Sequence, residues 1–138
     1  MSLTCPFCNI ALGKAEASIV YEDETVLAFM DLSPAVEGHT LVVPRGHWEN
    51  IYEVPDEVLA DVAVAVKRVC VAAKKAVGAD GVKVIQLNGR AAGQVVFHLH
   101  FHIIPVRARE GTVIGHHGRT RYDRKSLDET AKKIRENL

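Results

Sequence analysis

The chain lacks several features that would assign it at once to a broad class. It has only three cysteines in 138 residues, too few for a disulfide framework. Its 17 basic and 17 acidic residues cancel, so no overall field favours nucleic acid or an anionic membrane. No apolar run approaches the roughly 20 residues of a membrane span, and the start of the chain lacks the basic-then-apolar order of a signal peptide. We therefore expect a cytoplasmic protein that binds neither nucleic acid nor a membrane.

The remaining composition is that of an ordinary globular protein. Hydrophobic residues make up 48% of the chain and charged residues 25%, which argues against disorder. A length of 138 residues suits one domain with a real core, and no internal repeat or linker divides it. We therefore treat residues 1–138 as a single domain whose partners must be inferred from a site.

Five short segments have the β-branched enrichment of strands. Residues 18–22 and 25–29 flank the polar Asp23-Glu24 pair and predict a hairpin. Residues 39–44, 82–87 and 98–104 predict three more strands. Together these segments favour an antiparallel sheet.

Helical spacing appears in the middle and at the end of the chain. Between Pro55 and Gly78, which are good start and stop signals, apolar residues recur at three- and four-residue steps. These residues are Val58, Leu59, Val62, Val66, Val69, Cys70, Ala73 and Val77. Ser126 with Glu129 resembles a capping box and predicts a final helix over 127–136, and residues 5–14 suit a helical turn or two. The pattern predicts an α+β domain.

The segment HLHFHII, residues 98–104, places three histidines at every second position. In an extended strand, His98, His100 and His102 share one face, while the apolar residues between them face a core. A lone histidine on such a strand is usually structural. Three in register predict a functional face, since neutral imidazole binds metals, transfers protons and attacks electrophiles.

The Cys5-Pro-Phe-Cys8 motif is a two-thiolate half-site for a metal. A tetrahedral zinc ion needs two further ligands, and His47 and His98 are the candidates. Four protein ligands leave no open position, so this zinc would be structural. The alternatives are two thiols in an N-terminal turn or a redox pair. The third cysteine, Cys70, lies on the apolar stripe of the long helix and suits the core.

HLHFHII fits the pattern of the histidine triad (HIT) family, and three further motifs lie at family-like spacing. These are the segments 29–34 (FMDLSP), 38–44 (GHTLVVP) and 92–94 (AGQ). The chain resembles a bacterial, Hint-like nucleotide-binding member over residues 5–105, which leaves 106–138 as a C-terminal extension. The resemblance implies the HIT-like fold: a five-stranded antiparallel sheet, one long helix and a C-terminal helix. It also implies a homodimer with a joined sheet, and in part of the family a zinc site of the CxxC kind.

The same resemblance assigns roles to the histidines. It implies that His100 is the nucleophile, which forms a covalent nucleotidyl intermediate that water then resolves. A neutral imidazole nitrogen is a competent nucleophile near neutral pH, and the covalent route splits one displacement into two easier ones. His102 and His39 are candidates for the surrounding hydrogen-bond network. If His98 holds zinc, it cannot also act as a free acid.

The nucleotide-binding residues are likewise implied by resemblance. Asp31 matches the carboxylate that binds the ribose hydroxyls, although a turn cap before Ser33 is its structural alternative. The residues that match the apolar walls around a purine are Phe7, Ile10, Phe29 and Leu32. The residues that match positions that bind phosphate or shape its pocket are Asn88, Gly93, Gln94 and the backbone N–H of Val95.

Two positions depart from the family pattern. Leu87 stands where many relatives carry a polar amide, and Val95 replaces a Ser or Thr whose hydroxyl contacts the phosphate or leaving group. A side-chain proton donor is therefore missing at position 95. This leaves His98, His102 or water to protonate the leaving group.

The resemblance implies an enzyme that cleaves purine nucleoside 5′-phosphoramidates or adenylated compounds at the α-phosphate. One alternative is a dinucleoside polyphosphate hydrolase, for which four arginines after Pro105 could neutralise the phosphate tail. These are Arg107, Arg109, Arg119 and Arg121. Another alternative is a nucleotide-binding adaptor with weak catalysis, which the departure at Val95 keeps open.

Overall fold

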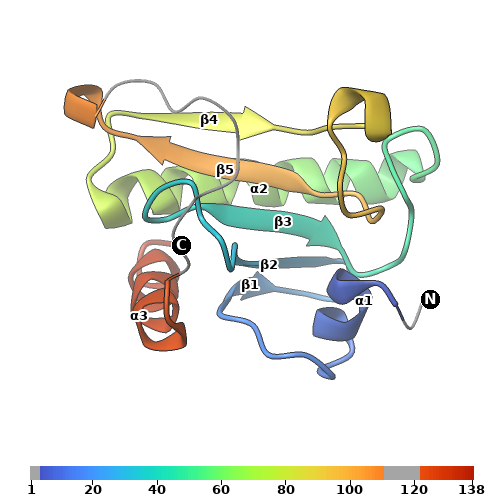
Figure 1. Cartoon of the computed structure of the whole chain (residues 1–138), viewed down its shortest axis with the longest axis horizontal. Coiled ribbons are helices and arrows are strands. Elements are labelled where there is room, and N and C mark those ends of the chain that lie inside the picture. Colours follow the sequence, from blue (N-terminus) through green and yellow to red (C-terminus); the bar gives the residue numbers. More distant parts are fainter. Residues whose placement is uncertain (1–3, 111–121) are drawn as a thin grey trace.

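The computed structural model describes residues 4–110 and 122–138, and its central element is a five-stranded antiparallel sheet (Figure 1). Its strands lie in the order β1-β2-β3-β5-β4. Their bounds are β1 Ile19–Glu22, β2 Val26–Met30, β3 Thr40–Pro44, β4 Gly81–Ile85 and β5 Phe101–Val106. The helices are α1 Pro6–Ala11, α2 Asp56–Val77 and α3 Arg124–Arg135, with 3₁₀ turns η1 Arg90–Ala92 and η2 Ala108–Glu110. The predicted α+β class and HIT-like sheet are confirmed.

The β1–β2 hairpin closes at the predicted polar turn. The Asp23 carboxylate accepts hydrogen bonds from the backbone N–H groups of Thr25 and Val26, and the N–H of Asp23 donates to the carbonyl of Val26. A short side chain that bonds its own backbone in this way stabilises a tight reversal.

Helix α2 has the predicted ends. Pro55 precedes it, Asp56 and Glu57 occupy its first turn, and Gly78 ends it in the left-handed conformation. The apolar stripe of α2 packs on one face of the sheet. Burial raises the pKa of the Cys70 thiol on this helix, as is usual for a cysteine packed against a core. Within the described residues no helix has both the length and the apolar character needed to cross a bilayer.

Helix α3 starts earlier than the sequence predicts. Its N-cap is Asp123, whose carboxylate accepts from the N–H of Ser126, so the capping box at Ser126 is wrong. Leu127, Ala131 and Ile134 of this helix are fully buried in the core beneath α2. The C-terminal helix therefore belongs to the core.

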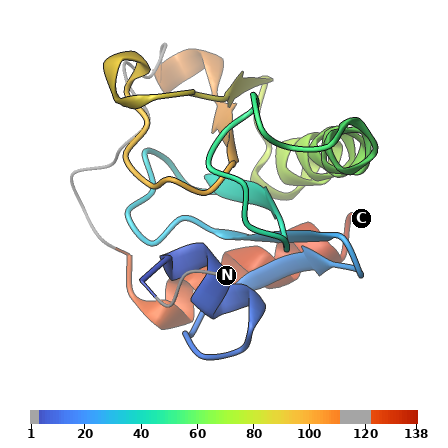
Figure 2. The ribbon, with the colours of Figure 1, turned by 90° about the vertical axis from the view of Figure 1, so that its right-hand side faces the viewer.

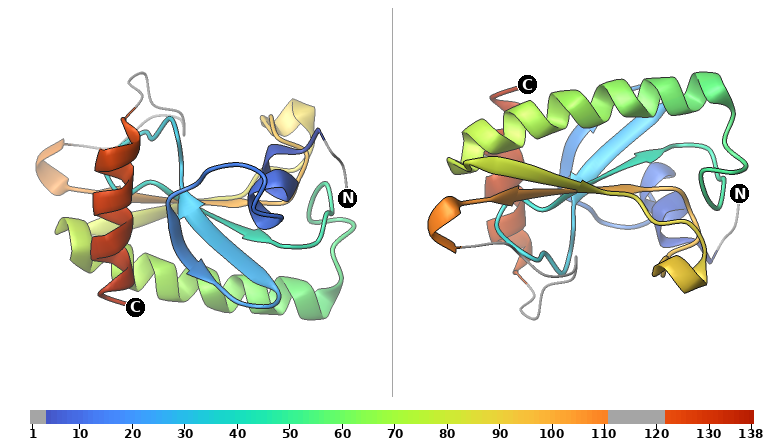
Figure 3. Two further views of the ribbon diagram at one scale, coloured as in Figure 1. Left: turned by 90° about the horizontal axis from the view of Figure 1, so that it is seen from below. Right: turned by 90° about the horizontal axis from the view of Figure 1, so that it is seen from above.

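The two faces of the sheet are covered differently. Val26, Ala28 and Met30 of β2 point toward α2 and α3, whereas Leu27 and Phe29 point toward α1. The right view of Figure 3 shows α2 on one side of the sheet, with α1 and η1 on the other. Figure 2 looks along the sheet with α2 nearly end-on and α1 below the connection from η1 to β5. This connection carries the first two triad histidines.

The histidine segment is less regular than predicted. Strand β5 begins at Phe101, so only His102 of the triad lies within a strand. The ladder with β3 runs from Thr40 to Val42, after which the carbonyl of Pro44 accepts from the ring of His98. The N–H of Leu99 donates to the carbonyl of Trp48. Side-chain and loop partners thus replace strand pairing before Phe101.

Candidate active site and metal centre

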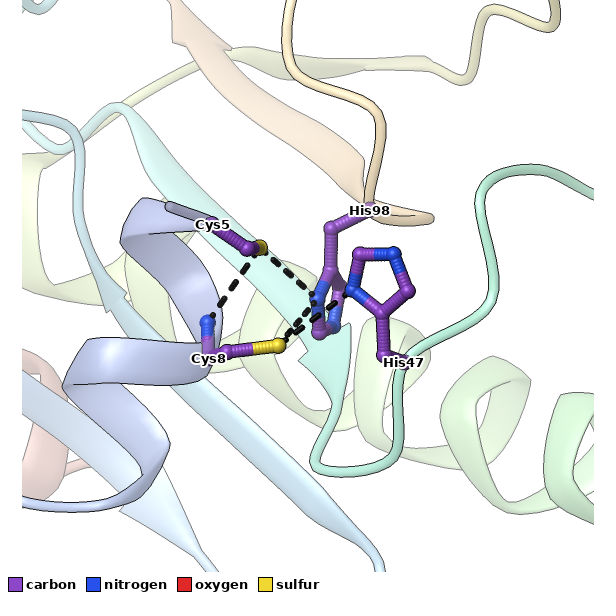
Figure 4. A group of neighbouring side chains, drawn as sticks. All are labelled: Cys5, Cys8, His47 and His98. Atoms are coloured by element: carbon purple, nitrogen blue, oxygen red, sulfur yellow. Dashed lines mark hydrogen bonds between the residues drawn. The ribbon is translucent and has the colours of Figure 1, made fainter. Parts of the chain in front are cut away.

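Two cysteines and two histidines converge where α1 meets the end of β3. Cys5 is the N-cap of α1 and Cys8 lies in its first turn, His47 comes from the loop after β3, and His98 from the segment before β5 (Figure 4). Their ligand atoms all lie within 4.8 Å of one another. The structure therefore brings together the four residues predicted to bind zinc.

The distances in this cluster suit a tetrahedral ion. The Cys5 Sγ lies 3.4 Å from His98 Nδ1, and the Cys8 Sγ lies 3.3 Å from His47 Nδ1 and 3.6 Å from His98 Nδ1. A tetrahedron with metal–ligand distances of about 2.0–2.3 Å has edges of roughly 3.6 Å. The four side chains thus surround a space of the size that zinc needs.

His98 is held in the form that binds a metal. Its Nε2–H donates to the carbonyl of Pro44 at 2.8 Å, which leaves the lone pair on Nδ1, facing the sulfur atoms. Burial lowers the pKa of His98 to about 4, with smaller contributions from His47 and His100. The ring is therefore neutral at pH 7, as a ligand must be.

His100 and His102 turn the other way, into a pocket of about 250 Å³. The Nδ1 of His100 donates to the carbonyl of His98 at 2.7 Å, so the lone pair of its neutral ring lies on Nε2. The ring packs edge-on against Phe7, with centroids 5.1 Å apart, and against His102 at 5.0 Å.

His39 fixes the state of His102. The N–H of Ala35 donates to His39 Nδ1 at 3.0 Å, so the neutral ring carries its proton on Nε2. That Nε2 lies 3.0 Å from His102 Nδ1 and 3.4 Å from the carboxylate of Asp31. His102 therefore accepts on Nδ1 and bears its own proton on Nε2.

Most residues expected to bind the nucleotide line the pocket. The lining includes Phe7, Ile10, Phe29, Asp31, Leu32, Gly93 and Val95, along with the two histidines. Asp31 also caps a turn, since its carboxylate accepts from the N–H of Ser33 at 2.8 Å. Asp31 can thus cap this turn and line the pocket at the same time.

Asn88 and Gln94 shape the loop and do not line the pocket. The Gln94 amide donates to the carbonyls of Glu49 and Val96 and accepts from the N–H of Gly89. Asn88 exchanges hydrogen bonds with Gln86 and accepts from the N–H of Ile51. Gly93 ends η1 with φ at +99°, a conformation that favours glycine, and brings the backbone to the pocket.

The arginines after Pro105 do not reach this pocket where the structure describes them. Arg107 donates to the carbonyl of Val77 at the end of α2. Arg107 and Arg109 both line a separate surface hollow beside that end of the helix. Arg119 and Arg121 lie outside the described residues. Arg107 and Arg109 thus do not line the nucleotide pocket, and their role toward a polyphosphate tail stays a prediction.

Sequence reasoning missed two charged residues of the pocket. Glu16, before β1, and Arg124, in the first turn of α3, both line it. Neither lies in a recognisable motif. Only the packing of α3 beside β1 brings them to the site.

Comparison with known proteins identifies the family. The HIT domain model matches residues 13–109. The chain belongs to the HIT family. An uncharacterised HIT-like protein of Saccharolobus solfataricus is 44% identical over 110 residues, which cover 80% of this chain and 79% of that protein. The adenosine 5′-monophosphoramidase of Schizosaccharomyces pombe is 42% identical over 103 residues, or 75% of this chain and 74% of the other.

A solved HIT structure is also similar over nearly the whole length. The zinc-bound histidine triad family protein of Mycobacterium smegmatis superposes with a TM-score of 0.86 at 33% identity. The match covers 99% of this HIT chain and 94% of that one.

Proposed function

We propose that this protein hydrolyses purine nucleoside 5′-phosphoramidates, or related adenylated compounds, at the α-phosphate through a covalent nucleotidyl-His100 intermediate. The observation that carries the proposal is the hydrogen bond from His100 Nδ1 to the carbonyl of His98, in a pocket with apolar walls. It makes Nε2 the nucleophilic nitrogen. The activity named for the 42% identical relative of Schizosaccharomyces pombe supports this substrate class.

The reaction takes two displacements. His100 Nε2 attacks the α-phosphorus, a phosphorus–nitrogen bond forms, and the bond to the leaving amine breaks. The carbonyl of His98 stabilises the positive charge that develops on the ring, because it accepts from Nδ1–H. Water then attacks the phosphorus and gives up one proton, which replaces the proton lost to the leaving amine in the first step. The phosphorus–nitrogen bond breaks, and His100 leaves as a neutral ring with release of the nucleoside monophosphate.

His102 is the proton donor that the geometry favours. It bears its proton on Nε2, since Nδ1 accepts from His39. His98 is excluded from this role, because Nε2 is bonded to Pro44 and Nδ1 faces the cysteines. His102 or water therefore protonates the leaving amine, in place of the hydroxyl that is absent at Val95.

The pocket walls suit a nucleoside. Phe7 and Phe29 pack edge-on with centroids 5.3 Å apart and offer aromatic surface to a base. Ile10 and Leu32 extend this wall, and Asp31 faces the pocket with a carboxylate that can accept from ribose hydroxyls. The loop at Gly93 presents backbone to the phosphate.

Zinc is the ion that the cluster of Cys5, Cys8, His47 and His98 fits best, through two thiolates and two imidazoles at tetrahedral spacing. When bound, it would tie α1, the loop after β3 and the segment before β5 together. Its role in this proposal is structural.

A homodimer joined along β4 completes the proposal. This strand forms one edge of the sheet, and Val84 on it is 46% exposed. Open strand edges with apolar side chains are natural pairing surfaces. Light scattering of Val84→Lys against wild type tests this, with a monomeric variant expected.

Steady-state turnover tests the proposal. Adenosine 5′-phosphoramidate and a diadenosine polyphosphate are compared side by side, with His100→Ala as the control. We expect turnover of the phosphoramidate to fall by about 10³-fold or more in the variant. Preference for the polyphosphate would favour the alternative hydrolase. AMP binding without cleavage of either compound would favour the adaptor.

A further inference from the structure

Arg124 stands in the pocket with a fixed orientation. Its Nη1 donates to the hydroxyl of Ser18 at 2.8 Å, and that hydroxyl donates to the carboxylate of Asp128 at 2.6 Å. Ser18 is 2% exposed, and Asp128 lies one helical turn beyond Arg124 on α3. The guanidinium also lies 3.7 Å from the carboxylate of Glu16. Ser18, Asp128 and Glu16 thus hold the planar Arg124 guanidinium at the wall of a largely apolar pocket.

The position of Arg124 is away from the phosphate-binding loop. The N–H of Met30 donates to the carbonyl of Ser18, so these two residues lie side by side, and Asp31 follows Met30 in the chain. Arg124 is therefore attached on the side of the pocket that holds Asp31, whereas Gly93 and Val95 line it from the connection after η1. In the left view of Figure 3 the start of α3 and η1 lie apart, with α1 nearer to η1.

This placement rests on the proposed function, in which the phosphate lies at His100 and the ribose at Asp31. The base then lies against the wall formed by Phe7 and Phe29 and extends toward Arg124 and Glu16, which both line the pocket. A guanidinium pairs bidentately with O6 and N7 of guanine, both of which are acceptors. On adenine it meets one acceptor, N7, beside the N6 amino donor.

We propose that Arg124 is a specificity-determining residue that makes guanine the preferred base of this pocket. Glu16 accepts from N1–H and the N2 amino group of guanine. This contribution is smaller, because the Glu16 side chain is 77% exposed and its charge is screened by solvent. Ser18 and Asp128 act as positioning residues that hold the guanidinium.

Calorimetric binding of GMP and AMP tests the inference. We expect wild-type protein to bind GMP at least about fivefold more tightly, which corresponds to the ~1 kcal/mol lower bound for one bidentate pair. Arg124→Ala removes this difference. Arg124→Gln reverses it, because a Gln amide pairs bidentately with N6 and N7 of adenine.

Lys125→Gln is the matched control, since it removes one positive charge at the neighbouring, exposed position of α3. Its GMP to AMP ratio should equal that of wild type. Equal binding of both nucleotides by wild type, or an unchanged ratio in Arg124→Ala and Arg124→Gln, overturns the inference and leaves the proposed function standing. If neither nucleotide binds, the proposed function fails as well.

Discussion

The HLHFH segment serves two regions of the molecule that use the same side chain differently. His98 directs Nδ1 to two sulfur atoms and ties its other nitrogen to Pro44. Two residues later, His100 ties Nδ1 to a carbonyl and keeps its lone pair on Nε2 toward the pocket. The hydrogen bond made by one ring nitrogen decides what the other can do. One histidine is thus suited to hold a metal and the next to attack phosphorus.

Loss of the thiolates should have the largest effect on stability and separate the two regions. We expect the double variant Cys5→Ser, Cys8→Ser to lose bound zinc and at least about 3 kcal/mol of unfolding free energy, since metal binding contributes directly to folding. Metal analysis and denaturant unfolding measure both. Cys70→Ala is the control and should keep its metal. Unchanged zinc content in the double variant would remove the metal centre from our interpretation.

The metal-free protein should become less stable as the pH falls. The pKa of His98 is about 4 in the folded state, below the ~6.5 of an unfolded chain, so unfolding takes up a proton between these values. The stabilisation is present above pH 6.5 and is lost toward pH 4. We expect about 2 kcal/mol less unfolding free energy at pH 5 than at pH 7.

Urea unfolding of chelator-treated protein measures this loss. His98→Gln, which lacks the titrating ring, provides the comparison and should show a shallower pH dependence. Equal slopes for the two proteins would mean that His98 is not the group responsible.

Breaking the His39–His102 contact should affect the pocket alone. His39→Phe keeps a ring of similar size but leaves His102 Nδ1 and the N–H of Ala35 without their partner, so we expect kcat to fall about 10- to 100-fold. The N–H of Ala35 is partly buried, so the loss of its acceptor also costs about 1 kcal/mol of stability. His39→Gln, whose amide reaches toward His102, should recover part of kcat. Equal kcat for both variants would argue against a positioning role.

The smallest effect is expected at Val95. Its side chain is 69% exposed beside the pocket, so Val95→Ser should change the unfolding free energy by no more than about 0.5 kcal/mol. The added hydroxyl supplies a proton donor near the leaving group and should raise kcat a few-fold. Val95→Ala removes the same bulk without a hydroxyl and is the matched control. If kcat rose equally in Val95→Ala, the cause would be the smaller side chain and not the hydroxyl.

Local signals predicted those parts of the fold that are locally determined. The turn at Asp23 and the ends of α2 at Pro55 and Gly78 depend on backbone chemistry within a few residues. The four metal-binding candidates were predicted because no third cysteine lies near the CxxC motif, which made histidines the candidate partners. The roles implied by resemblance for the pocket residues remain predictions.

Tertiary contacts determine the features of the fold and the pocket that the sequence pattern did not predict. The start of β5 depends on Pro44 and Trp48, whose carbonyls take the hydrogen bonds of His98 and Leu99. The start of α3 depends on Asp123, which competes with Ser126 as a cap. Arg124 joined the pocket only because α3 packs beside β1, a contact between segments about a hundred residues apart.

The division of labour between the two regions is tested most directly by measuring metal content and phosphoramidate turnover together in His47→Ala and His100→Ala. His47 contacts Cys8 but does not line the nucleotide pocket. We predict that His47→Ala loses metal and keeps kcat within about tenfold, whereas His100→Ala keeps metal and loses turnover by about 10³-fold or more. Retained turnover in His100→Ala, or loss of metal in that variant, would contradict the assignment.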